Sequence, residues 1–158
     1  MRSAVILWLR FLLVGILAGS LLGQVLVVLI AQANGREMPE VEHLVVPYAI
    51  AGIAAIVCFQ VAVGCIWALL AMVESGRIYS TRALRWVEAI IWCGGTAAGI
   101  VVATAGHLLF LERLGGPGVP LGIMVALVTG SAFVLLMVVM RGLLATAIAD
   151  RAELAEVI

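Results

Sequence analysis

The chain has 158 residues, of which 65% are hydrophobic and only 11% are charged, and its nine basic and nine acidic side chains give a net charge of zero. Ordinary soluble domains are roughly 45–50% apolar and about 25% charged, so this composition excludes a typical soluble domain. The balanced charge provides no basic excess to attract a nucleic acid, and we expect no direct nucleic acid binding. The sequence therefore indicates an integral membrane protein.

Four long apolar stretches account for most of the chain, at residues 4–33, 47–73, 83–111 and 119–148. A helix that spans a bilayer needs about 20 mostly apolar residues, and each stretch is longer than that. The short connections favour antiparallel neighbours, so we expect an all-α, up-down-up-down four-helix bundle that forms one transmembrane domain over residues 1–158. Residues 149–158 are expected to continue as a cytoplasmic helical tail.

All nine basic residues are arginine, and their positions predict the orientation of the bundle, because cytoplasmic connections carry an excess of Arg and Lys. Seven arginines fall at one end of the predicted bundle and two at the other: Arg2, Arg10, Arg77, Arg82, Arg85, Arg141 and Arg151 against Arg36 and Arg113. Both termini are therefore expected in the cytoplasm. The exclusive use of arginine suggests a GC-rich bacterial genome, and hence a multi-pass protein of a bacterial cytoplasmic (inner) membrane.

Small residues recur every four positions in three of the stretches. The repeats are Gly15, Gly19 and Gly23 in the first, Gly95, Gly99 and Ala103 in the third, and Gly118, Gly122, Ala126 and Gly130 in the fourth. Such repeats allow helix backbones to approach closely in a membrane. They favour either a tightly packed monomer or a homo-oligomer, and the sequence does not distinguish the two.

Seven polar residues inside the stretches are candidates for the bundle interior: Gln24, Gln60, Glu88, Thr96, Thr104, His107 and Thr129. Of these, Gln24, Gln60, Glu88, Thr104 and His107 are candidates for a polar core or a ligand site. Intramembrane polar groups are costly and usually face the bundle interior. The structural interpretation gives the two amides a bond to a neighbouring helix and pairs Glu88 with an arginine, either Arg85, Arg10 or Arg141. The functional interpretation is an apolar ligand or lipid whose polar end binds these groups, or a polar path through a small transporter or channel component.

The sequence carries no catalytic or metal-binding motif that we can identify. It has no HExxH, no phosphate-binding loop and no Ser/His/Asp set in a plausible order. The cysteines Cys58, Cys65 and Cys93 form no CxxC motif and are interpreted as packing residues, with Cys65 and Cys93 at similar depths on neighbouring helices. We therefore expect a non-enzymatic protein without a cofactor or a metal.

The segment at 74–86, with the sequence Glu-Ser-Gly-Arg-Ile-Tyr-Ser-Thr-Arg-Ala-Leu-Arg-Trp, resembles the central loop of an uncharacterised bacterial four-span membrane-protein family. In that family a Gly-x-x-Phe-Ser-type loop leads into an arginine-containing third span, and Tyr79 stands here in place of the usual phenylalanine. The final residues, 143–158, are similar to the family's C-terminus. Some members are encoded beside a small Cro/CI-like helix-turn-helix regulator, so the resemblance implies a regulatory association. It implies no activity.

The arginines of this loop provide a candidate contact surface at the cytoplasmic face. Arg77, Arg82 and Arg85 lie near Tyr79 in the sequence and are expected to contact either anionic lipid headgroups or an acidic partner surface. Taken together, the sequence favours a membrane protein that senses or binds a ligand and acts on a partner through the 74–85 loop. The alternative is the transporter or channel component.

Overall fold

The computed structural model describes residues 2–37, 42–75, 80–110 and 118–156, which form four α-helices. The helices are α1 (Arg2–Glu37), α2 (Glu42–Glu74), α3 (Thr81–Phe110) and α4 (Gly118–Glu156). Within these ranges there is no strand, which confirms the all-α architecture. Each helix contains a segment long and apolar enough to cross a membrane: Ala4–Ala33, Leu44–Glu74, Thr81–Phe110 and Gly118–Ala152.

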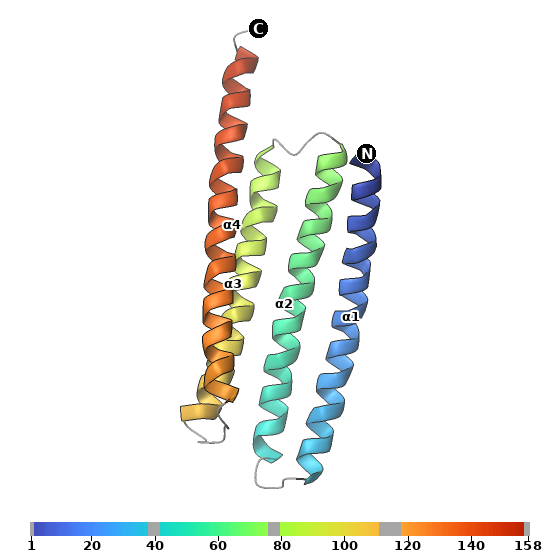
Figure 1. The fold of residues 1–158 in the computed structure, drawn as a ribbon, viewed down its shortest axis with the longest axis vertical. Coiled ribbons are helices and arrows are strands. Elements are labelled where there is room, and N and C mark those ends of the chain that lie inside the picture. Colours follow the sequence, from blue (N-terminus) through green and yellow to red (C-terminus); the bar gives the residue numbers. More distant parts are fainter. Residues whose placement is uncertain (1, 38–41, 76–79, 111–117, 157–158) are drawn as a thin grey trace.

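Three helix ends lie four or more residues beyond the expected membrane spans. The helix α1 ends at Glu37 and its span at 33, α2 begins at Glu42, five residues before the expected span start at Pro47, and α4 runs to Glu156, past the expected span end at 148. A proline near the start of a helix removes only one backbone donor, so the apolar residues before Pro47 still join α2. The last turns of α4 extend beyond the ends of the other three helices (Figure 1), as expected for a helical tail.

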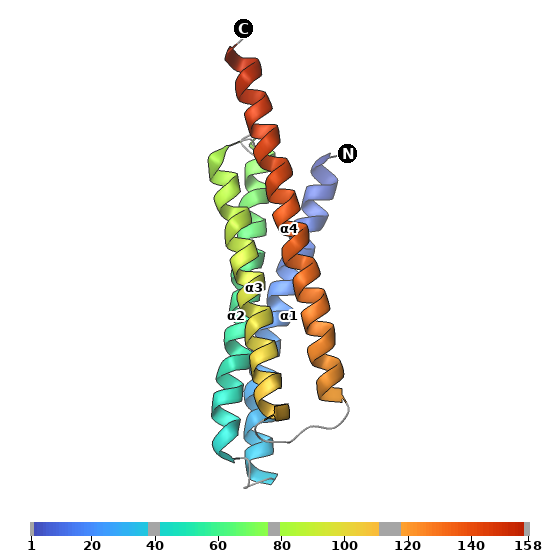
Figure 2. The ribbon, with the colours of Figure 1, turned by 90° about the vertical axis from the view of Figure 1, so that its left-hand side faces the viewer.

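The four helices form a curved row in chain order, with neighbouring helices antiparallel (Figures 1 and 2). Packing occurs between α1 and α2, α2 and α3, and α3 and α4, and no Cα of α1 comes within 8 Å of α3 or α4 in the described segments. Both α1 and α4 lie on the same side of the α2–α3 pair (Figure 2). The concave side of the row therefore faces the space between α1 and α4.

The close-packed core occupies only one half of the molecule. We name the end at which α1 begins and α2 ends the Arg10 end, and the opposite end the Tyr48 end. The buried side chains of the described residues all lie in the half toward the Arg10 end: Leu13, Ala62, Val63, Cys65, Leu70, Ala83, Val87 and Ile90. The other half of the row is less tightly packed, and this difference positions the candidate site.

The small-residue repeats contribute to helix packing at some positions only. A Cβ built on Gly130 would lie 2.8 Å from the Cβ of Ala98, so α3 and α4 approach closely there. Nothing lies within 4 Å of a Cβ built on Gly15, Gly19 or Gly23. The repeat of α1 thus does not pack in the monomer, because α1 contacts α2 through a different face.

Candidate functional site

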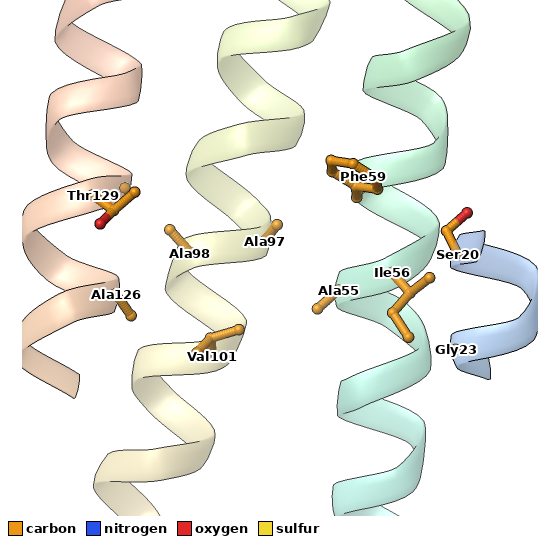
Figure 3. Close-up of a pocket in the computed structure, with 11 residues that line it drawn as sticks. Ser20, Gly23, Ala55, Ile56, Phe59, Ala97, Ala98, Val101, Ala126 and Thr129 are labelled. Atoms are coloured by element: carbon orange, nitrogen blue, oxygen red, sulfur yellow. The ribbon is translucent and has the colours of Figure 1, made fainter. Parts of the chain in front are cut away.

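A laterally open groove lies on the concave side of the row, at mid-height of the helices. Its volume is about 480 Å³ and all four helices line it (Figure 3). Ser20 and Gly23 of α1 lie on one side, and Ala126 and Thr129 of α4 on the other, with α2 and α3 between them (Figure 3). The remaining lining residues are Ala55, Ile56, Phe59, Ala97, Ala98, Val101 and Gly130.

The groove exists because short side chains line the space between α1 and α4. Alanine and glycine supply more than half of the lining, and only Ser20 and Thr129 carry a polar group. A Cβ built on Gly23 meets nothing within 4 Å, so no neighbouring side chain fills the space at α1. The surface of the groove is therefore almost entirely apolar.

A second cavity extends the groove toward the Tyr48 end. It has a volume of about 380 Å³ and is lined by α2, α3 and α4. Val101 lines both cavities, which places them next to each other along α3. The second cavity is also lined by Tyr48, Gly52, Ile100, Thr104, Ala105, Leu108, Val119 and Gly122.

The two intramembrane glutamines join α1 to α2. The Gln24 Nε2 donates to the Gln60 Oε1 at 3.3 Å, and the Gln60 Nε2 donates to the Ser20 Oγ at 3.1 Å. The Ser20 hydroxyl in turn donates to the Leu17 carbonyl at 2.8 Å. Gln24 and Gln60 line neither of the two cavities, whereas Ser20 lines the groove. This network has the geometry of an interhelical packing contact.

His107 and Thr104 lie together near the Tyr48 end. The Tyr48 hydroxyl lies 2.8 Å from the His107 Nδ1, with the two rings edge to face and their centroids 6.1 Å apart. A third cavity of about 520 Å³ is lined by Tyr48, Thr104 and His107 together with Leu44, Pro47, Ala51 and Ala103. The Thr104 hydroxyl donates to the Ile100 carbonyl at 2.7 Å. Hydrogen-bonding side chains thus gather where α2 begins and α3 ends.

The charged residues pair across helices toward the Arg10 end. The Glu88 carboxylate lies 3.7 Å from the Arg141 guanidinium of α4, so Arg141 is its partner among the three arginines considered from the sequence. Arg10 of α1 pairs with Glu74 of α2, and its guanidinium lies 5.7 Å from the centroid of the Trp67 ring. All four charged side chains of these pairs are more than a third exposed, which is the setting in which ion pairs contribute little to stability.

The candidate partner loop is described in part. Arg82 and Arg85 are exposed on the first turns of α3. Arg77 and Tyr79 lie outside the described residues.

Among the residues that the structure describes, no group of three or more His, Cys, Asp or Glu side chains could hold a metal ion. Cys93 packs against the cluster that contains Cys65.

Sequence reasoning missed most residues of the groove. Gly23, Gly122, Ala126 and Gly130 were identified, but as members of helix-packing repeats, although each of the four lines one of the two cavities. The same spacing places small residues on one helix face whether that face meets a helix or borders a cavity. Tyr48 was missed because a tyrosine near a predicted span end is typical of the membrane interface.

A family model described as "Protein of unknown function (DUF2975)" matches residues 29–158. The chain belongs to this family. The DUF2975 match covers α2, α3 and α4 completely and the last part of α1, so three of the four helices that line the groove lie wholly within it. No curated protein and no solved structure matches the chain. Together with the four apolar helices, membership supports a multi-pass membrane protein of an uncharacterised family.

Proposed function

We propose that this DUF2975 protein is a non-enzymatic sensor of a bacterial cytoplasmic membrane, which binds an apolar, lipid-like ligand in the four-helix groove. Binding of the ligand would act on a cytoplasmic partner through a change in the 74–85 connection. The observation that carries the proposal is the groove itself, because α1 and α4 border one cavity although no Cα of one helix lies within 8 Å of a Cα of the other. A ligand that touches both helices would set their separation.

The lining favours an apolar ligand. Small-molecule sites of about 300–1,000 Å³ are mostly apolar, with a few polar groups that fix orientation, and the groove falls in this range at about 480 Å³. A sugar or a nucleotide would leave polar groups unpaired against alanine and valine side chains, at about 1–3 kcal/mol for each group. A lipid or an isoprenoid chain would leave none along its length.

The helix connectivity favours transmission of a structural change from the groove to the Arg10 end. Both α2 and α3 line the groove, and the 74–85 connection joins them. A change in the α2–α3 contact on ligand binding would therefore reach Arg82 and Arg85, which are exposed at that connection. The arginine distribution predicts that this connection is cytoplasmic. The proposed partner is a small helix-turn-helix regulator with an acidic docking surface.

A transporter or channel path is less well supported by the geometry. The polar residues that would form it pair at separate places: Gln24 with Gln60 between α1 and α2, Glu88 with Arg141 between α3 and α4, and His107 with Tyr48 between α2 and α3. Of these, only Tyr48 and His107 line any of the three cavities.

Ligand binding is tested by filling the groove without disturbing helix contacts. Gly23 lines the groove and Gly122 lines the second cavity, and both have open space around a built Cβ, so the double variant Gly23→Leu/Gly122→Leu adds one side chain to each cavity. The matched control is Gly15→Leu/Gly142→Leu, at two glycines with the same open surroundings on the same two helices. Native mass spectrometry of detergent-released protein should retain lipid in the wild type and the control. Equal retention by the groove-filled variant would contradict the proposal.

Partner binding is tested at the exposed arginines. The variant Arg82→Glu/Arg85→Glu should abolish co-purification of the regulator while the protein still inserts and folds. The comparison is made with the protein reconstituted in vesicles of anionic or of zwitterionic lipid, because arginines that only contact headgroups would leave the regulator bound after the charge reversal in both. Co-purification that survives the charge reversal would contradict the docking role of this connection.

A further inference from the structure

We infer that the ligand is a membrane lipid, one acyl chain of which lies along the groove parallel to the helices, with the polar head at the Tyr48 end. This inference rests on the proposed function and names its ligand class. It is carried by the length of the site, by the depth of its two ends and by its volume.

The two adjoining cavities have the length of one leaflet. Their lining residues run from Tyr48 to Phe59 on α2, from Ala97 to Leu108 on α3 and from Val119 to Gly130 on α4, an interval of 11 residues on each helix. At a rise of about 1.5 Å per residue, each interval is about 16 Å long. The hydrocarbon core of a bilayer is about 30 Å thick, so one leaflet supplies chains about 15 Å deep.

The depths of the two ends fix the direction of the lipid. Phe59 lies at the middle of α2 and Ala97 near the middle of α3, so we expect this end of the groove near the centre of the membrane. Tyr48 lies near the start of α2, where the membrane surface is expected. A polar head at the central end would be buried in hydrocarbon without partners, which is strongly unfavourable. The chain terminus therefore lies at Phe59 and the head at Tyr48.

The Tyr48 end also supplies the hydrogen-bonding side chains that a lipid head needs. Tyr48 and Thr104 line both the second and the third cavity, and the third cavity adds His107. When the phenol donates to the His107 Nδ1, the ring proton is on Nε2 and can be donated to an ester or phosphate oxygen. The central end offers only the Ser20 and Thr129 hydroxyls.

The volume is in the range of a small-molecule site. The two cavities hold about 480 and 380 Å³. Such sites measure about 300–1,000 Å³.

A chain-length experiment tests the inference. The full-length protein is reconstituted in vesicles that contain phosphatidylglycerols of several chain lengths, and the lipids it retains are identified by native mass spectrometry. Gly23→Leu fills the central end, so the retained population should shift to shorter chains with little change in total lipid. Gly122→Leu fills the path beside Tyr48 and should reduce retention of every length by about tenfold. Gly15→Leu and Gly142→Leu are the matched controls and should retain the wild-type distribution.

The outcomes separate this inference from the proposed function. If the wild type retains no lipid, the proposed function itself is wrong. If the wild type retains lipid but Gly23→Leu lowers all chain lengths equally, or selects longer chains, the ligand does not lie with its terminus at Phe59 and the inference is overturned. A shift to shorter chains in Gly122→Leu instead of Gly23→Leu would show that the lipid lies in the opposite direction.

Discussion

Replacing Gln60 by leucine should loosen α1 from α2. Gln60 makes two interhelical hydrogen bonds, to Gln24 and to Ser20, whereas Gln24 makes one of these. Interhelical hydrogen bonds in membranes contribute about 0.6 kcal/mol each on average. We therefore expect Gln60→Leu to lower the free energy of unfolding by about 1.2 kcal/mol and Gln24→Leu by about 0.6 kcal/mol.

The double variant Gln24→Leu/Gln60→Leu distinguishes this network from independent contacts. Because Gln60→Leu already removes the partner of Gln24, the double variant should cost no more than Gln60→Leu alone. Unfolding is measured by titrating dodecylmaltoside micelles with sodium dodecyl sulfate and following the helical circular dichroism. Gln32→Leu, at an exposed position of α1, is the control for added hydrophobicity. Additive costs in the double variant, or a smaller cost for Gln60→Leu than for Gln24→Leu, would refute the reasoning.

Three further predictions concern two helix contacts and the orientation of the helices in the membrane. Gly130→Ala should destabilise the α3–α4 contact by about 1–3 kcal/mol, because its Cβ would lie 2.8 Å from that of Ala98. Gly122→Ala, whose Cβ lies in open space, should leave the free energy of unfolding unchanged, and equal stabilities of the two variants in the detergent titration would count against the packing described. Arg10→Leu should cost about 0.5–1 kcal/mol through the loss of its contact with the Trp67 ring, and a cost that persists unchanged in a Trp67→Leu background would exclude that contact. Single cysteines at positions 40 and 78, in a background without the native cysteines, should label from opposite faces of the membrane, and labelling from one face would overturn the predicted topology.

The positions of the helices were predictable from sequence because the requirement is local. A stretch of more than about 20 apolar residues is long enough for a membrane helix whatever surrounds it. The partner of Glu88 was only narrowed to three arginines, because the choice depends on how α3 and α4 are rotated against each other, and the structure selects Arg141. The interhelical bond of Gln60 was predicted by its type, while its link to Ser20 was not.

The groove was not predictable from the sequence, because it depends on whether another helix lies opposite each small residue. Gly130 and Gly23 look equivalent in the sequence, as members of four-residue repeats. Gly130 faces Ala98 and makes a close helix contact, whereas Gly23 faces open space. This difference arises from the separation of α1 and α4, which no local pattern encodes. The binding role assigned to Gln24, Gln60 and Thr104 remains a prediction, and of these only Thr104 lines a cavity that we describe.

Photo-crosslinking from a lipid chain tests the central claim most directly. Two phosphatidylglycerol probes carry a diazirine on the acyl chain, one near the terminal methyl and one near the ester. The terminal probe should form adducts at residues 97–101 and 126–130, and the ester-proximal probe at residues 48–52 and 119–122. Adducts that spread evenly over the exposed apolar surface, for example at Phe11 and Leu135, with no difference between the probes, would contradict a lipid chain bound in the groove.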